Sequence, residues 1–486
     1  FVGKTVVSFF VLFHKIILSK KVSFFHKQLD FFNGVCGNFF LQFFQIKGER
    51  QVEKVQVKQL YHLEAPKGLL NDPNGLVEFQ KNFHVFFQWN PKEKNHSYKC
   101  WGHFISEDFL HWKFLGKAIE PSEKFDNFGT YSGSACVVGE KIFIYYTGND
   151  KSSGARKSSQ CLAISDDGEN FKKVGVILET PKNFTEHFRD PKIHFDGKNF
   201  EIYIGTQKID GKGSIVFSKS ADGKNFGEVK IIGESKNFEM IECPDLINFG
   251  EEKILLYGLQ KRDNIADTTS FSESVYKIFD NGDLDNFTAK VDCGFDFYAP
   301  QIFETSDGRK IMYAWMSRLS DAQEKILADC AENIHCLTMP REIFLRDKKI
   351  FQKPVREMYK IIGEKITAKK IPRTFYLKSF VEEDFKILLN NEIKIFWSVE
   401  DKIFKFLRKD WSDDGWEEKI CEIEKIFEIE MWSDVSSVEI FLNGGEIALS
   451  ARLLPEKNFF EIEIVGLDFE KINLREIKIE NFLGGF

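Results

Sequence analysis

Gln80-Lys81-Asn82-Phe83-His84-Val85-Phe86-Phe87 joins a polar turn to an apolar and aromatic run, and the chain repeats this pattern. Four later stretches have the same order, a turn built from Gly, Asp, Asn, Glu, Arg and Lys followed by β-branched, aliphatic and aromatic residues, at 139–146, 196–204, 250–257 and 307–315. The five copies recur at intervals of about 57 residues, which is typical of a β-propeller with one four-stranded sheet per repeat. The repeat therefore predicts five blades.

A second motif recurs inside three of the repeats and supports the same fold. Residues 105–112, 164–171 and 218–226 share a Ser, then an Asp, then an aromatic residue a few positions later. Such polar clusters between apolar runs are typical of hairpin turns in all-β proteins. We interpret them as turns between the outer strands of each blade.

Unusual polar clusters lie just upstream of every repeat turn, at nearly the same place in each copy. They are Asp72, Ser132-Gly133-Ser134, Arg189-Asp190, Glu242-Cys243-Pro244-Asp245 and Asp296-Phe297-Tyr298. By itself, Asn71-Asp72-Pro73-Asn74-Gly75 would predict only a tight turn. Because equivalent positions of a propeller surround one axis, we expect all five clusters to converge on the central channel.

Several carboxylates in one channel indicate acid and base chemistry. Mutual repulsion should raise the pKa of at least one of them. One ionised and one protonated carboxylate are what glycoside hydrolysis requires, as nucleophile and as proton donor. An acidic channel could instead bind a cation such as calcium, but no run of alternating acidic residues typical of a calcium loop occurs. We therefore predict no metal site.

Composition limits the other function classes. The chain has 486 residues and a net charge of -7, which predicts two domains and, without a basic stripe, no nucleic-acid partner. Nine scattered cysteines form no Cys-x-x-Cys pair, so neither a zinc site nor a disulfide framework is predicted. We expect reduced thiols and a cytoplasmic location.

The first fifty residues are an N-terminal extension of unknown role. The apolar run at 5–13 is too short to span a bilayer, and we expect no membrane partner. Secretion is the alternative to the cytoplasm if residues 1–20 act as a signal sequence.

Seven segments together resemble, in order, the successive motifs of glycoside hydrolase family 32. They are Tyr61-His62 through Gly75, residues 83–91, Trp101-Gly102-His103, Tyr131-Ser132-Gly133-Ser134, residues 188–192, Glu242-Cys243-Pro244-Asp245 and residues 295–301. The resemblance implies a retaining β-fructofuranosidase that needs no cofactor and acts on sucrose or its 6-phosphate. Leu69-Leu70 stands where plant and yeast members usually have Trp-Met, which favours the bacterial intracellular branch.

The resemblance also implies residue roles. Asp72 would be the nucleophile that forms a fructosyl ester, and Glu242 the general acid and then the base. Asp190, with Arg189, would hold fructose hydroxyls and stabilise the oxocarbenium-like transition state. The substrate-binding residues would be Leu69, Leu70, Asn71, Gln88, Trp101, Tyr131, Ser132, Arg189, Tyr298 and Trp315. Without the resemblance, Gln88 and Ser132 could be strand or turn residues, and Trp101, Tyr298 and Trp315 are more often core aromatics.

Beyond Met339-Pro340-Arg341-Glu342 the repeat is absent and short strand-like runs follow. We expect residues 51–345 to form the five-bladed β-propeller catalytic domain and residues 346–486 a β-sandwich. The clearest strand, Val438–Leu442, runs into an Asn-Gly hairpin. We expect the sandwich to serve as a cap on the propeller or as the surface of a homodimer, and its lectin-like pattern leaves a carbohydrate-binding role as the alternative.

Three other activities remain open at this stage. A fructan hydrolase (levanase or inulinase) would differ on the aglycone side of the site, and a fructosyltransferase would resolve the intermediate with a sugar instead of water. A non-catalytic sugar-binding propeller is the alternative from another class. The intact set of Asp72, Asp190 and Glu242 argues against the last of these.

Overall fold

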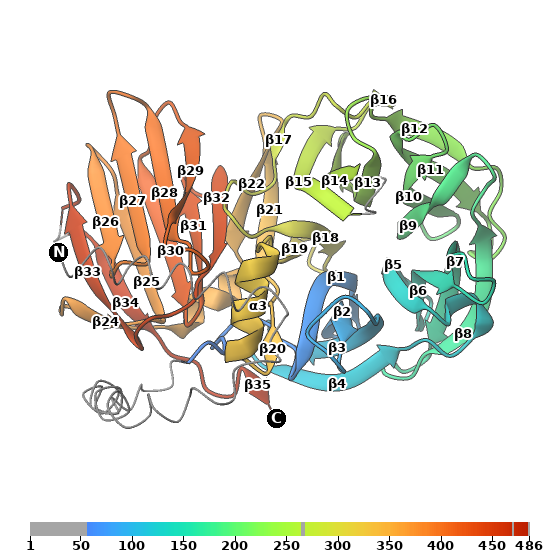
Figure 1. Ribbon diagram of the computed structural model, residues 1–486, viewed down its shortest axis with the longest axis horizontal. Coiled ribbons are helices and arrows are strands. Elements are labelled where there is room, and N and C mark those ends of the chain that lie inside the picture. Colours follow the sequence, from blue (N-terminus) through green and yellow to red (C-terminus); the bar gives the residue numbers. More distant parts are fainter. Residues whose placement is uncertain (1–55, 264–267, 469–470, 485–486) are drawn as a thin grey trace, which may run out of the picture. The chain divides into compact units, whose positions relative to one another are not determined.

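The computed structural model describes residues 56–263, 268–468 and 471–484, and it is almost entirely β. Five sheets stand around one axis, and two further sheets lie beside them (Figure 1). The predicted five-bladed β-propeller followed by a β-sandwich is thereby confirmed. The expectations for residues 1–50, including a signal sequence within residues 1–20, lie outside the described residues.

Each propeller sheet begins with the strand nearest the axis and continues outward by antiparallel pairing. Blade 1 has β1 (Gly68–Phe79), β2 (Asn82–Asn90), β3 (Cys100–Ser106) and β4 (Trp112–Ile119), with β20 (Asn333–Ile334) and β35 (Leu483–Gly484) added in parallel at its edges. Blade 2 has β5 (Gly129–Val138), β6 (Lys141–Asp150), β7 (Lys157–Ser165) and β8 (Lys172–Glu179), and the 3-10 turn η1 (Lys124–Asp126) precedes it.

The other three blades follow the same plan. Blade 3 has β9 (Phe184–Phe195), β10 (Phe200–Lys208), β11 (Gly213–Ser220) and β12 (Lys230–Glu234), joined at its edge by β16 (Gly282–Asp283). Blade 4 has β13 (Met240–Phe249), β14 (Glu252–Asp263), β15 (Thr268–Ile278) and β17 (Ala289–Lys290). Blade 5 has β18 (Tyr298–Glu304), β19 (Lys310–Trp315), β21 (Arg341–Arg346) and β22 (Lys349–Pro354).

The repeated turns join the first two strands of each blade. Gly139, Gly197, Gly250 and Gly308 occupy these turns with φ of 60°, 92°, 66° and 81°. Such left-handed dihedrals cost glycine nothing, because it has no Cβ. Blade 1 makes the same turn with Gln80 and Lys81, at φ of 49° and 67°. The turn geometry explains why small and polar residues recur at this point of the repeat.

The second repeated motif forms the predicted turns between the third and fourth strands. In blade 1 the Asp108 carboxylate accepts the backbone N–H groups of Leu110 and His111 at 2.9 and 2.8 Å. Asp167 and Asp222 do the same in blades 2 and 3. Each Asp therefore satisfies backbone groups that the hairpin leaves free.

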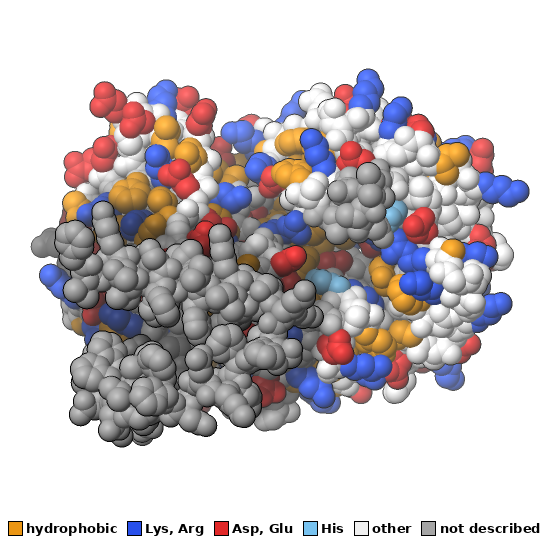
Figure 2. Space-filling model, in the orientation of Figure 1, with side chains coloured by type: hydrophobic (Ala, Val, Ile, Leu, Met, Phe, Trp, Pro, Cys, Tyr) orange, Lys and Arg blue, Asp and Glu red, His pale blue; other side chains and the backbone are white. Residues whose placement is uncertain are grey.

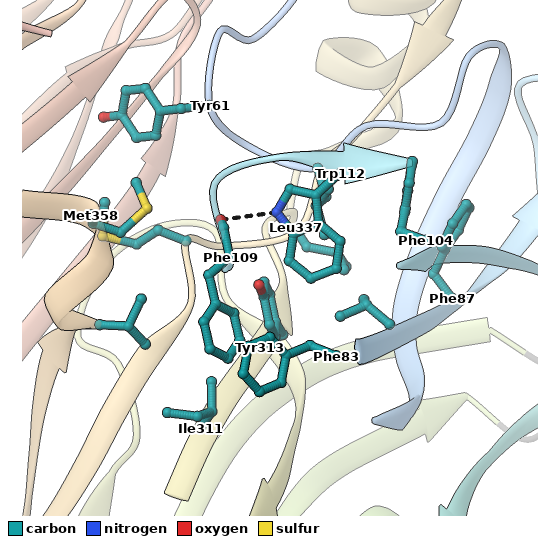
Figure 3. Close-up of a cluster of buried hydrophobic side chains, with 14 of the residues drawn as sticks. Tyr61, Phe83, Phe87, Phe104, Phe109, Trp112, Ile311, Tyr313, Leu337 and Met358 are labelled. Atoms are coloured by element: carbon teal, nitrogen blue, oxygen red, sulfur yellow. Dashed lines mark hydrogen bonds between the residues drawn. The ribbon is translucent and has the colours of Figure 1, made fainter. Parts of the chain in front are cut away.

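One buried cluster closes the ring between blades 1 and 5 (Figure 3). Phe83 and Trp112 of blade 1 pack with Ile311 and Tyr313 of blade 5, and the Trp112 indole N–H donates to the Phe109 carbonyl at 2.9 Å. The same cluster includes Trp432, Phe441 and other residues of the C-terminal sheets. Burial of aromatic side chains is the main source of stability at such a contact.

The C-terminal sandwich consists of two six-stranded sheets around a second core. One sheet contains β23 (Ile362–Lys365), β34 (Asn473–Ile477), β25 (Phe375–Phe380), β30 (Glu428–Asp434), β31 (Ser437–Leu442) and β32 (Ile447–Arg452). The other contains β24 (Lys370–Pro372), β33 (Phe459–Val465), β26 (Phe385–Leu389), β27 (Ile393–Ser398), β28 (Ile403–Lys409) and β29 (Trp416–Glu422). A 3-10 helix, η2 (Arg356–Ile361), links blade 5 to these sheets.

The described ranges contain one α-helix, α3 (Asp321–Cys330), in the connection between β19 and β21. Ser320 caps it, accepting the Gln323 backbone N–H. Leu327 of α3 is buried with Leu69 and Ile334, so the helix packs over the start of β1. No helix in the described part of the chain has the length and apolarity needed to cross a membrane.

A buried ion cluster ties blade 5 to the sandwich. The Arg341 guanidinium of β21 donates to Glu439 of β31 at 2.8 Å, to Asp292 at 2.9 Å and to Ser450 of β32 at 2.5 Å. The Arg341, Asp292 and Glu439 side chains are fully buried. Removing the cation would leave Asp292 in the interior without its counter-charge and Glu439 with His62 as its remaining ion-pair partner.

Arg341→Met is therefore expected to destabilise the protein by about 3–5 kcal/mol, the usual cost of breaking a buried ion pair on one side. The melting temperature should fall by about 5 °C or more. Lys349→Gln is the control, because it breaks the exposed Lys349–Glu446 pair and should cost no more than about 1 kcal/mol. Equal melting temperatures for the two variants would show that the buried cluster does not stabilise this contact.

Candidate active site

The innermost strand of every blade is interrupted at the same point, and each interruption lies at a predicted site cluster. Regular pairing breaks between Leu70 and Pro73, between Tyr131 and Gly133, between Glu242 and Asp245, and between Tyr298 and Gln301. In β9 it breaks at Asp190-Pro191, between Arg189 and Lys192. A bulge re-aims the side chains beside it. Four of the five bulges contain Pro (Pro73, Pro191, Pro244 and Pro300), which has no N–H to pair.

The bulges also hold backbone strain. Asp190, Cys243 and Ala299 precede their prolines with φ of 63°, 45° and 49°. Residues other than glycine rarely adopt this region, and strained backbone is concentrated at functional sites. The bulge register makes Glu242 equivalent to Arg189 and Cys243 equivalent to Asp190.

Asp72 of β1 is held by hydrogen bonds to both carboxylate oxygens. Ser132 Oγ donates to Oδ2 at 2.6 Å, and Asn71 Nδ2 donates to Oδ1 at 3.0 Å. Lys99 Nζ contacts Asn71 Oδ1 and lies 2.8 Å from His96 Nδ1. Ser132 of the neighbouring blade 2 and Asn71 of β1 thus orient Asp72, and the buried Lys99 contacts Asn71.

Glu242 of β13 has four donors around its carboxylate. Arg189 approaches Oε1 with Nε at 2.9 Å and also with Nη2. Tyr298 OH donates to Oε2 at 2.9 Å, and Gln260 Nε2 contacts the same oxygen. Paired contacts from one guanidinium fix the orientation of a carboxylate. Blades 3, 4 and 5 therefore all contribute to the position of Glu242.

Asp190 completes the group of carboxylates. Its Oδ2 accepts the Cys243 backbone N–H at 3.1 Å and the Cys243 thiol at 3.5 Å, and it lies 3.9 Å from Arg189 Nε. The Asp190 N–H donates to Thr147 Oγ1 at 3.1 Å. Asp190 and Glu242 thus share one arginine between them.

The pKa values of two site carboxylates are raised, as the sequence predicts for carboxylates crowded into one channel. Burial raises the pKa of Asp72, and the charge of Glu242 adds to that effect, while Ser132, Asn71 and Lys99 oppose it. Burial also raises the pKa of Asp190, again with Glu242 and Asp72 adding and Arg189 opposing. These mutual effects place the three carboxylates in one electrostatic neighbourhood. Figure 2 shows a hollow near the centre of the ring, bordered by acidic, basic and histidine side chains.

Ser132→Ala should shift the acid limb of kcat/KM to higher pH. The Ser132 hydroxyl favours the ionised form of Asp72 and lowers its pKa, so its loss raises that pKa. A nucleophile must be ionised, and activity should therefore be lost at a higher pH on acidification. Ser134→Ala is the control, because Ser134 Oγ donates to the Pro191 carbonyl and does not contact Asp72. An unchanged acid limb in Ser132→Ala would contradict this role of the hydrogen bond.

The other predicted residues divide between the site and the core. Asn71, Ser132, Arg189 and Tyr298 contact the carboxylates, as described above. Trp101 and Leu70 are fully buried in core clusters, and Leu69 packs against α3.

The remaining predicted residues contact the inner strands or nearby rings. Gln88 donates to the Thr130 carbonyl at 3.0 Å, and the Tyr131 carbonyl accepts the Trp101 indole N–H at 3.0 Å. Trp315 lies against His96 and His335, with ring centroids 5.9 and 5.3 Å away.

Three residues that touch the site side chains were not anticipated from the sequence. Lys99 contacts Asn71, and Gln260 contacts Glu242. His187 accepts a hydrogen bond from Arg189 Nη1 at 2.7 Å. Lys99 is a buried lysine next to an apolar strand, a rare combination that would have been a usable signal. Within the described ranges, no group of three or more His, Cys, Asp and Glu side chains is arranged to hold a metal ion.

Comparison with known proteins gives two family-model matches that together cover most of the chain. Residues 62–354 match the glycosyl hydrolases family 32 N-terminal domain, and residues 384–479 match the family 32 C-terminal domain. The sucrose-6-phosphate hydrolase of Bacillus subtilis is 35% identical over 434 residues, covering 82% of this chain and 89% of the relative. That of Salmonella typhimurium is 31% identical over 423 residues, covering 81% and 88%.

Solved structures agree with these relatives. The structure of sucrose-6-phosphate hydrolase from Lactobacillus gasseri superposes with a TM-score of 0.74 at 25% identity, covering 89% of this chain and 95% of that one. A family 32 β-fructofuranosidase from Bombyx mori in complex with sucrose gives a TM-score of 0.75 at 21% identity, covering 93% and 100%, which supports the fold.

Proposed function

Since this chain belongs to glycosyl hydrolase family 32, we propose that it is a β-fructofuranosidase that cleaves sucrose or sucrose 6-phosphate. The observation that supports this most is the set of three buried or half-buried carboxylates from blades 1, 3 and 4, each held by donors from a neighbouring blade. Two carboxylates on either side of a glycosidic bond are the machinery of a retaining glycosidase.

In the proposed reaction, an Asp72 oxygen attacks the anomeric carbon of the fructosyl unit while Glu242 gives a proton to the departing glycosidic oxygen. The first product is a fructosyl ester on Asp72 and a free glucose or glucose 6-phosphate. Glu242 then takes a proton from water, whose oxygen attacks the same carbon and releases fructose with Asp72 restored. Asp190 would accept hydrogen bonds from fructose hydroxyls and stabilise the positive charge of the transition state.

Substrate binding would involve the residues that surround these carboxylates. Asn71, Ser132, Arg189 and Tyr298 already hydrogen-bond to catalytic oxygens, so they would position both the catalysts and the fructose ring. We retain Leu69, Leu70, Gln88, Trp101, Tyr131 and Trp315 as residues that shape this pocket. For Leu70 and Trp101 the role would be indirect, because both pack in the core behind the inner strands.

We also propose a domain organisation and a cellular location. The propeller would be the catalytic domain and would end at Pro354, the last residue of its fifth sheet, beyond the expected residue 345. The sandwich would cap it, and its use in a homodimer stays a prediction. The eight cysteines of the described part of the chain are all free, which supports a reducing cytoplasm.

The proposed function is tested by following glucose or glucose 6-phosphate, and fructose, released from sucrose and from sucrose 6-phosphate by the purified full chain. Hydrolysis of either sugar is expected. Activity on levan or inulin but on neither sucrose derivative would favour a fructan hydrolase, and transfer of fructose to sucrose would indicate a fructosyltransferase. Binding of sugars without hydrolysis would overturn the enzyme assignment.

A further inference from the structure

Arg156 extends the hydrogen-bonded network of the site toward solvent. It immediately precedes β7 in the β6–β7 connection, and its side chain is half-buried. Its Nη2 lies 3.1 Å from Nδ1 of His187, which itself lies 2.7 Å from Nη1 of Arg189. Contacts therefore lead from Glu242 through Arg189 and His187 to Arg156.

One nitrogen of His187 is shared by the two arginines. A guanidinium can only donate hydrogen bonds, so Nδ1 of His187 must be an acceptor toward both arginines. Two cationic guanidinium groups consequently converge on one ring nitrogen, and they repel one another.

Among the described residues, only one of the two arginines has carboxylates beside it. Arg189 is paired with Glu242 and lies close to Asp190. In the described part of the chain, no carboxylate lies within ion-pair distance of Arg156, whose guanidinium contacts His187 alone. The half-buried guanidinium thus has donors left for an anion, and an anion placed there would relieve the repulsion.

The place of Arg156 in the network that begins at Glu242 indicates which kind of anion Arg156 would bind. In the proposed reaction Glu242 protonates the glycosidic oxygen, so the leaving sugar begins at Glu242 and extends away from Asp72. Arg156 lies beyond Arg189 and His187 on the partly exposed side of the network. A phosphate ester on the leaving sugar is a dianion with several acceptor oxygens, and the planar fork of a guanidinium matches it.

We propose that Arg156 binds the phosphate group of a substrate phosphorylated on its leaving sugar, and so sets a preference for sucrose 6-phosphate over sucrose. The inference rests on the proposed function, and it names the substrate class and one residue that selects it. The Bacillus subtilis relative is named for the phosphorylated sugar, which agrees with this substrate class.

A structural role for Arg156 would have a different signature. If its side chain only oriented His187, and through it Arg189, its loss would impair both sugars equally. If it binds phosphate, its loss should impair only the phosphorylated sugar. The ratio of kcat/KM values for the two substrates therefore separates the two roles.

The experiment compares wild type, Arg156→Gln and Lys157→Gln on sucrose and sucrose 6-phosphate. Arg156→Gln is expected to lower the ratio of kcat/KM for sucrose 6-phosphate over sucrose by about 10- to 100-fold, the effect of losing a hydrogen-bonded charge. Lys157→Gln removes the same charge from the adjacent exposed residue and should leave the ratio within about twofold. An equal fall for both sugars, or an unchanged ratio in Arg156→Gln, overturns the inference.

A binding measurement keeps this inference separate from the proposed activity. Calorimetry with glucose 6-phosphate and glucose should show tighter binding of the phosphorylated sugar by wild type, and loss of that advantage in Arg156→Gln. Wild type that hydrolyses sucrose but binds and cleaves the phosphorylated forms no better overturns the inference and leaves the proposed function intact. If wild type hydrolyses neither sugar, the proposed function fails, and the calorimetry alone decides the role of Arg156.

Discussion

Asp72→Ala is expected to lower kcat for sucrose or sucrose 6-phosphate by about four orders of magnitude or more, the scale of losing a nucleophile. The variant should fold normally, because Asp72 is half-buried at the site and does not belong to the core clusters. Steady-state kinetics, with circular dichroism as the test of folding, measures both. Without the carboxylate no fructosyl ester can form, whatever the pH.

Asp108→Ala is a suitable control for this variant. It makes the same substitution in the same blade, at a surface turn where the carboxylate holds backbone N–H groups and takes no part in the site. Its kcat should stay near that of wild type. Hydrolysis by Asp72→Ala at the wild-type rate would remove the basis for the proposed mechanism.

Glu242→Gln should give the second largest effect, a fall in kcat/KM on sucrose of about 10² to 10⁴. The amide has the size of the carboxylate but cannot give a proton to the leaving oxygen. A fructoside with an activated leaving group, such as a nitrophenyl fructoside, needs no such proton. Its kcat/KM should therefore fall much less, and comparison of the two substrates measures the acid role directly.

Glu273→Gln provides the matched control for Glu242→Gln. Glu273 is in the same blade and pairs with Lys290 at 2.7 Å, away from the site carboxylates. Its kinetics should match those of wild type on both substrates. Equal losses on sucrose and on the activated fructoside in Glu242→Gln would mean that Glu242 positions substrate and does not donate a proton.

The propeller could be predicted because its repeat is periodic in sequence. The turns after the inner strands need residues that tolerate left-handed φ, and this need recurs in every blade. The convergence of the polar clusters followed from the same periodicity. The strand pairing adds that Glu242 is equivalent to Arg189 and Cys243 to Asp190, since the bulges of β9 and β13 have the same register.

The surroundings of the carboxylates could not be derived in the same way. Lys99, Gln260 and His187 reach the site from a loop, the end of a second strand and the start of β9, and these positions share no repeated sequence pattern. Trp101 was expected at the site because it lies inside a family-like motif, but its side chain is in the core with 0% exposure. Sequence alone gives the residue type there but not the direction of the side chain.

The covalent intermediate offers the most direct test of the mechanism. Glu242→Gln would be mixed with an activated fructoside, so that the ester forms readily but is hydrolysed slowly for want of a base, and the quenched protein would be digested and analysed by mass spectrometry. One fructosyl unit on the peptide that contains Asp72, and none in Asp72→Ala, is the expected result. Turnover of the fructoside without any labelled peptide, or a label on another residue, would contradict the role proposed for Asp72.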